Sequence, residues 1–176
     1  MSYAGSLDAN LNDNSVSLTL SSVAGHHHQR GPDALQTQLG YMHNINDNRY
    51  VSMGLHVIGE TGKSDNPLEL GVGGKLIGID TPSASLLYGL MIGVELRYYP
   101  KSVNRLSYSG QLYYGPNVVV SSNADNFKEL GLRAEYQILP QAFAYLGYRN
   151  VNVGFTGGND AEIDDSMHVG FRILFQ

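Results

Sequence analysis

Apolar and polar residues alternate along nearly the whole chain, and this period of two constrains the fold more than any other feature. In the stretch 106–120, Leu112 and Tyr114 fall on one side of an extended chain, while Gln111 and Tyr113 fall on the other. The same alternation recurs at 130–138 and 167–175. A helix would scatter these apolar residues around its axis, whereas a strand puts them on one face. The sequence therefore predicts an all-β protein.

The alternating stretches, separated by turn residues, predict about ten strands. They span residues 3–11, 15–22, 34–43, 49–60, 67–79, 86–99, 105–120, 127–139, 141–155 and 164–175. Connections such as Asn12-Asp13-Asn14 and Leu139-Pro140-Gln141 are typical turn sequences. If 3–22 were one bulged strand, the count would be nine. Single-chain bacterial barrels have even strand numbers, so we predict ten, with eight as the alternative. No linker divides the chain, and 1–176 is expected to be one domain.

Composition and charge exclude several classes of protein. Charged residues make up 15% of the 176 residues, below the roughly 25% typical of soluble domains, yet the mean hydropathy is slightly negative. This combination suits a sheet with one apolar and one polar face. The net charge of -5 and the lack of a basic stripe give no reason to expect a nucleic-acid partner. The absence of cysteine excludes disulfides and thiolate chemistry.

The chain offers no transmembrane helix, so a membrane-spanning form would have to cross with strands. Its longest apolar run, Leu86 to Val94, is far short of the ~20 residues that such a helix needs. No signal peptide precedes Ser2. If the chain is an exported barrel, we expect it to be the mature form of the protein, with a new start at Met1. We expect it to reside in the bacterial outer membrane.

Charged residues and glycines share the face opposite the apolar one. Five acids and five bases fall there: Glu60, Glu69, Glu95, Glu129 and Glu135 against Lys75, Arg97, Arg133, Arg149 and Arg172. Buried charges must be paired, and a glycine leaves room for a long side chain on the neighbouring strand. Small barrels are filled by their own side chains. We therefore predict that this face lines a narrow, polar lumen that is largely filled and conducts poorly.

Aromatic residues on the apolar face predict contact with lipid. If the N-terminus is periplasmic and the strands run up and down, these residues form two belts. Tyr98, Tyr108, Tyr136 and Phe175 fall near the periplasmic rim, and Tyr41, Tyr88, Tyr114 and Tyr148 fall nearer the outer rim. Bilayer interfaces favour amphipathic rings at both boundaries. The pattern predicts a transmembrane antiparallel up-and-down β-barrel, surrounded by lipid or detergent and expected to be a monomer.

Two resemblances to known proteins support a barrel. The last stretch, Met167 to Phe175, is similar to the terminal strand of outer-membrane barrels, which ends on an aromatic residue read by the barrel-assembly machinery; Gln176 departs from that ending. Four local patterns resemble the YfaZ family of outer-membrane proteins: residues 11–15 (LNDNS), 39–44 (LGYMHN), 71–76 (GVGGKL) and 145–149 (YLGYR). That family is regarded as porin-like without an established activity. The resemblance therefore implies a location more than a mechanism.

The histidines are candidates for metal binding or catalysis. His26-His27-His28 lies in a predicted loop, whereas structural metal sites need separated ligands on rigid elements. Ser166 and His168 share one strand face, but a rise near 3.3 Å per residue puts them about 6–7 Å apart, too far for a hydrogen bond. His56 is expected to be a neutral member of the interior polar network. No catalytic residue, metal or cofactor is predicted from these positions.

Acidic residues gather near the C-terminal strand, at Asp160, Glu162, Asp164 and Asp165. Carboxylates could bind Ca²⁺, but the glycine and glutamate of an EF-hand loop are missing. We interpret the group as a solvated acidic loop between the last two strands.

Three hypotheses for function follow. The leading one is a non-enzymatic outer-membrane barrel, either a porin-like pore or a structural protein. A barrel enzyme acting on lipid would need an outward-facing Ser or His at the rim, and none stands out. A soluble, lipocalin-like ligand-binding barrel would bury the apolar face inside and usually carries a Trp on its first strand, which this chain lacks.

Overall fold

The computed structural model describes residues 5–24, 34–61, 68–82, 84–103, 105–120, 124–155 and 159–175. At residues 60, 61, 84, 85, 118, 159 and 160 it describes the backbone alone. The strands are β1 (Gly5–Leu11), β2 (Ser15–Ala24), β3 (Ala34–Asn44), β4 (Arg49–Thr61), β5 (Leu68–Thr81), β6 (Ala84–Tyr98), β7 (Leu106–Pro116), β8 (Ala124–Leu139), β9 (Ala142–Phe155) and β10 (Asn159–Phe175). A short 3₁₀ helix, η1 (Asn117–Val119), follows β7.

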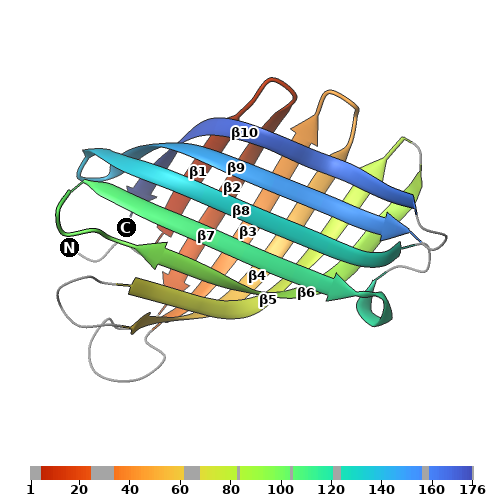
Figure 1. Ribbon diagram of the computed structural model, residues 1–176, viewed down its shortest axis with the longest axis horizontal. Helices are drawn as coiled ribbons and strands as arrows, with labels where there is room; N and C mark the ends of the chain where they lie inside the picture. Colours follow the sequence, from red (N-terminus) through yellow and green to blue (C-terminus); the bar gives the residue numbers. More distant parts are fainter. Residues whose placement is uncertain are drawn as a thin grey trace.

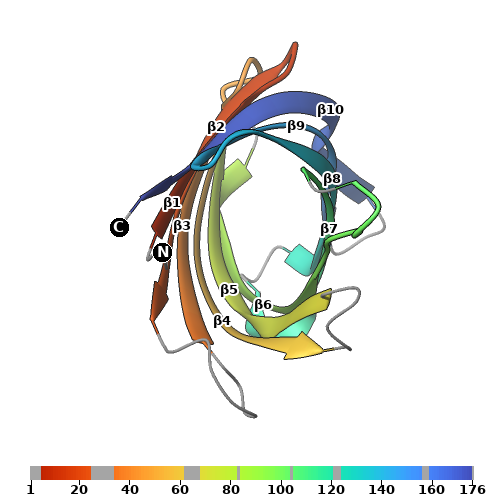
Figure 2. The ribbon, with the colours of Figure 1, turned by 90° about the vertical axis from the view of Figure 1, so that its left-hand side faces the viewer.

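The ten strands form one closed antiparallel barrel. Each strand pairs with its neighbours in the chain, and β1 pairs with β10 from Gly5–Phe175 to Leu11–Val169, which closes the sheet. Both ends of the chain therefore lie at the same end of the barrel (Figure 1), and Figure 2 looks along the barrel from that end. The prediction of an up-and-down barrel with ten strands is confirmed, and the eight-stranded alternative is wrong. No helix in the described ranges is long and apolar enough to cross a membrane.

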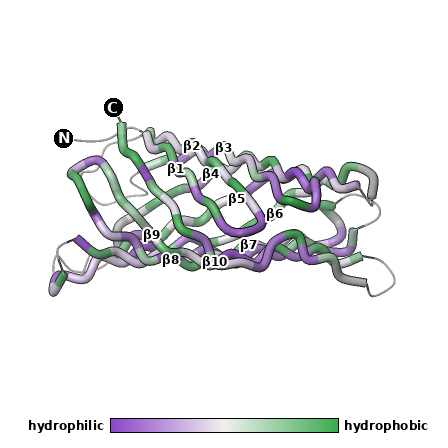
Figure 3. The backbone as a smooth tube through the Cα atoms, turned by 90° about the horizontal axis from the view of Figure 1, so that it is seen from above, coloured by the Kyte–Doolittle hydropathy of each residue, from purple (hydrophilic) through white to green (hydrophobic). Residues whose placement is uncertain are grey.

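The apolar face of the sheet points outward. Leu132 is 53% exposed and Phe171 is 60% exposed, whereas the neighbouring inward residue Arg172 is only 8% exposed. The tube in Figure 3 alternates between hydrophobic and hydrophilic colours along the strands for the same reason. Water would penalise such a surface, but the hydrocarbon core of a bilayer favours it. A lipocalin-like barrel has the opposite arrangement, with its apolar face inside.

Two strand boundaries differ by more than three residues from those predicted. β7 ends at Pro116, where the chain makes the η1 turn, and Val120 then forms a bridge with Gly89 and packs inward. β10 begins at Asn159, five residues earlier than predicted, so the prediction of a loop containing the acidic residues 160–165 is wrong. A bulge between Glu162 and Asp164 explains the error, because it buries the adjacent Ile163 and Asp164 and so interrupts the alternation.

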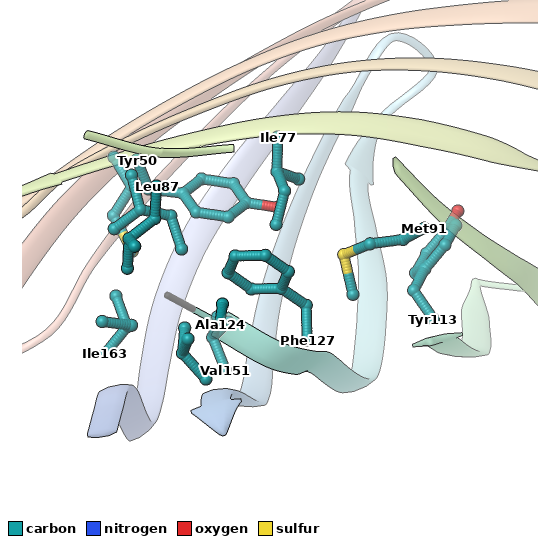
Figure 4. Close-up of a cluster of buried hydrophobic side chains, with 12 residues drawn as sticks. Tyr50, Ile77, Leu87, Met91, Tyr113, Ala124, Phe127, Val151 and Ile163 are labelled. Atoms are coloured by element: carbon teal, nitrogen blue, oxygen red, sulfur yellow. The ribbon is translucent and has the colours of Figure 1, made fainter. Parts of the chain in front are cut away.

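The lumen contains an apolar cluster at the end opposite the termini. It consists of Met42, Tyr50, Ile77, Ile79, Leu87, Met91, Tyr113, Ala124, Phe127, Val151, Val153 and Ile163. These side chains come from the ends of β3 to β10 that lie far from both termini, and they meet inside the barrel with the Phe127 ring in their midst (Figure 4). This part of the lumen is packed like the core of a soluble protein.

Candidate functional site

The other part of the lumen is a polar cavity of about 500 Å³. Its lining reaches from Gly5 and Leu174, at the end with the termini, to Met42, Tyr50 and Val151, which belong to the apolar cluster. The remaining members of the cluster do not border the cavity. Among the described residues, the lumen is thus divided into a polar compartment and an apolar one.

The two walls of the cavity differ in chemistry. On β2 and β3 the lining is neutral and hydrogen-bonding, with Ser17, Thr19, Ser21, Gln36 and Gln38. The lining from β5 to β10 carries most of the charges. Long ionic side chains on one wall therefore face short neutral ones on the other, which is how a narrow barrel can be filled without clashes.

The first cross-lumen connection is centred on Glu129. Its carboxylate accepts hydrogen bonds from the Lys75 ammonium at 2.8 Å, the Gln111 amide at 2.8 Å and the Tyr50 hydroxyl at 2.9 Å. Lys75 and Glu129 lie on β5 and β8, which are not neighbours in the sheet, so this ion pair spans the lumen. Both side chains are almost completely buried. Charges in a low-dielectric interior must be paired, and these two pair with each other.

A second connection joins β1 to the opposite wall. The Arg133 guanidinium donates to Asp8 at 2.5 Å and to Glu135 at 3.3 Å, and it stacks 3.8 Å from the centre of the Tyr145 ring. The Tyr145 hydroxyl also donates to Asp8, and Arg172 donates to Glu135. Glu135 is completely buried, and two guanidiniums balance its charge.

Two further ion pairs lie on neighbouring strands. Arg149 binds Asp164 at 2.6 Å and also donates to Ser15 and Ser17 across the lumen. Arg97 and Glu69 are 3.8 Å apart and about a quarter exposed, so theirs is the loosest of the lumen pairs.

Glu95 differs from the other lumen carboxylates because its partners are neutral. It accepts hydrogen bonds from the Tyr113 hydroxyl at 2.5 Å and from the Gln38 amide at 3.2 Å. The same Tyr113 oxygen is 2.7 Å from His56 Nε2. Since the single hydroxyl proton is donated to Glu95, His56 Nε2 must be the donor in that second hydrogen bond.

The alternation correctly places every predicted lumen residue whose side chain the structure describes. Nine of them face the interior: Glu69, Lys75, Glu95, Arg97, Glu129, Arg133, Glu135, Arg149 and Arg172. The side chain of Glu60 lies outside the described residues. Asp8 and Asp164 are also buried in the lumen but were not among the predicted residues. Asp8 alternates with Leu7 and Ala9 and could have been found, whereas the bulge hid Asp164.

These two additions change the charge balance. Within the described part of the chain, six lumen carboxylates (Asp8, Glu69, Glu95, Glu129, Glu135 and Asp164) face five cations (Lys75, Arg97, Arg133, Arg149 and Arg172). Among the described lumen residues, which leave out the Glu60 side chain, the equal balance inferred from the sequence is therefore replaced by an excess of one negative charge.

The predicted aromatic belts lie on the outer surface at the two ends of the barrel. Tyr41, Tyr88, Tyr108, Tyr114, Tyr136 and Phe175 are exposed, and Tyr98 and Tyr148 are half-buried. Tyr148 donates a hydrogen bond to Asp165 at 2.6 Å, on the outward face of β10.

Ser166 and His168 have separate partners in the described ranges. Ser166 donates to Asp164 at 2.8 Å, and the His168 ring packs edge-on against Tyr145. No group of three or more metal-ligating side chains occurs among the residues that the structure covers. His26 to His28 and Gln176 lie outside the described residues, as does the side chain of Asp160.

A closed ten-stranded barrel with an apolar outer band and a polar lumen defines an outer-membrane β-barrel protein. The family model of the YfaZ precursor matches residues 3–175, and the chain belongs to this family. The resemblance inferred from its strand and turn patterns is thereby confirmed.

Solved structures with a similar arrangement are distant in sequence. A bacterial polysaccharide outer membrane secretin is 11% identical, with a TM-score of 0.46 over 98% of this chain and 69% of that chain. The NanC porin is also 11% identical, with a TM-score of 0.44 over 98% of this chain and 100% of that chain. OmpT, an outer membrane protein of Vibrio cholerae, is 15% identical, with a TM-score of 0.37 over 97% and 64%. No curated protein matches the chain.

Proposed function

We propose that this protein is a non-enzymatic, porin-like barrel whose lumen is closed at the end opposite the termini. The observation that carries this proposal is the apolar cluster. Ile79, Phe127 and Val153 face inward and are completely buried, so little space remains between them. Hydrophobic constrictions of this kind exclude water and ions. The protein then acts as a structural barrel or a weakly conducting pore, with a polar compartment reached from the end that carries the termini.

The cross-lumen ion pairs add to this closure. Lys75–Glu129 and Arg133–Asp8 tie opposite walls together beneath the apolar cluster. A barrel of about ten strands leaves little bore once its inward side chains are in place. Wide aqueous channels belong to barrels of about sixteen strands or more.

Several further features are part of the same proposal. The protein is a monomer in the outer membrane that uses no cofactor and binds no nucleic acid. Its termini face the periplasm, and the barrel-assembly machinery recognises the strand that ends at Phe175.

Planar-bilayer recording of the purified protein tests the closure. We expect no large, long-lived conductance steps from the wild type. The double variant Leu87→Ser and Phe127→Ser should open the lumen, because hydroxyls at these inward positions let water enter the constriction. The matched control is Leu90→Ser with Leu130→Ser, on the outward face of the same two strands. Large steps from the wild type, or equal conductance from both double variants, would show that the apolar cluster is not the barrier.

A further inference from the structure

Glu95 carries a negative charge that the described residues do not neutralise. Every other lumen carboxylate in the described ranges has a Lys or Arg nitrogen within 4.0 Å, but the nearest basic atom to Glu95 is His56 Nε2 at 3.9 Å. A charge in a narrow lumen is costly unless it is paired. The excess negative charge among the described lumen residues is therefore located at this side chain.

His56 is a poor counter-ion for Glu95. Its Nε2 already donates to Tyr113, and its Nδ1 is completely buried with no hydrogen-bond partner. A protonated ring would bury an unsatisfied N–H at Nδ1, which is unfavourable, most of all for a charged group. The neutral ring is therefore favoured, and the charge of Glu95 remains uncompensated.

Glu95 also borders the polar cavity, so a ligand can reach it. Its side chain is 21% exposed and lines the cavity together with Gln38 and Ser21. Gln38 directs its amide nitrogen to Glu95, which leaves its amide oxygen as a possible acceptor. Ser21 pairs with Gln38 across β2 and β3, so its hydroxyl is close to the same point.

We propose that this part of the cavity binds a small organic cation through a primary ammonium group, with Glu95 as its counter-ion. An ammonium brings its own three N–H donors and needs only a few acceptors, which Glu95, Gln38 and Ser21 supply. A divalent metal ion requires several carboxylates, and a bare alkali ion requires more oxygen ligands than these side chains offer. This inference goes beyond the closed lumen and does not depend on whether the barrel conducts.

The side-chain amide resonance of Gln38 is a direct reporter, because this amide donates to Glu95. We would titrate ¹⁵N-labelled protein in detergent micelles with ethylammonium chloride, and separately with sodium chloride and sodium acetate. We expect a saturable shift of this resonance with ethylammonium alone. The resonance is identified by its loss in Gln38→Leu.

Two variants test the role of the carboxylate. Glu95→Gln should weaken ethylammonium binding by about tenfold or more, which corresponds to the loss of one charge-assisted hydrogen bond. Asp80→Asn removes the same charge from the exposed end of β5 and should bind like the wild type. The proposal is overturned by a wild-type titration without saturation, by unchanged affinity in Glu95→Gln, or by an equal response to sodium chloride. Apart from the assignment of the resonance through Gln38→Leu, the wild-type titration needs no variant to fold.

Discussion

Replacing Glu135 by glutamine tests whether the lumen charges stabilise the barrel. Glu135 is completely buried and accepts from both Arg172 and Arg133. Arg133 would keep Asp8 as a partner, but Arg172 would have no carboxylate within 4.0 Å among the described residues. Removing one partner of a buried ion pair costs about 3–5 kcal/mol, since the remaining charge stays buried without compensation. We expect Glu135→Gln to lower the free energy of unfolding by this amount.

Glu69→Gln is the matched control, with the same isosteric change in the same lumen. Its pair with Arg97 is 3.8 Å long and about a quarter exposed, so screening by water should limit the loss to roughly 1 kcal/mol. Unfolding by urea in lipid vesicles can be followed by circular dichroism and by heat-modifiable gel migration, since the chain has no Trp for fluorescence. Equal losses for the two variants would refute the idea that burial determines the strength of these pairs.

Two further predictions concern the outer surface and assembly. Leu132→Arg places a charge on the lipid-facing side of β8 and should make the free energy of folding into bilayers less favourable by roughly 2–4 kcal/mol. Gln111→Arg, in contrast, points into the lumen beside Glu129 and should fold well. Equal folding yields of the two variants in bilayers would contradict the observed sidedness. Phe175→Ala should slow insertion in cells, because the terminal aromatic is the feature that the assembly machinery is proposed to read. Pulse-chase labelling, with the folded barrel identified by its heat-modifiable gel migration, would detect this delay. Insertion at the wild-type rate would exclude such a role for the Phe175 ring.

Much of the fold could be predicted from the sequence because one physical rule governs almost every strand. A lipid-facing side chain must be apolar and the next one must tolerate a polar lumen, so the period of two identifies both faces at once. The rule fails where the chain leaves the regular ladder. Pro116 ends β7 and the bulge at Glu162 interrupts β10, and neither interruption has a hydrophobic signature of its own.

The apolar cluster was not predicted, although the sequence contains a signal for it. Where both faces of a strand are buried in apolar surroundings, alternation gives way to a continuous apolar run. Leu86 to Val94 is such a run, and Leu87 and Met91 from its inward face belong to the cluster. By its length alone, this run excludes a transmembrane helix but does not reveal the cluster. Cross-strand neighbours are needed to show that similar residues from eight strands meet at one level.

The glycines of the lumen explain how large side chains can cross so narrow a barrel. A Cβ atom at Gly170 would overlap the Tyr145 ring, and one at Gly93 would overlap Tyr113. Each tyrosine therefore lies flat over a glycine of the neighbouring strand and extends its hydroxyl to a carboxylate, Asp8 or Glu95. The sequence predicts that glycine makes room for a long neighbour, but it cannot identify that neighbour, because the pairing register is set by strands distant in the chain. The carboxylate that each tyrosine hydroxyl reaches is even harder to predict, since it depends on how the whole sheet closes.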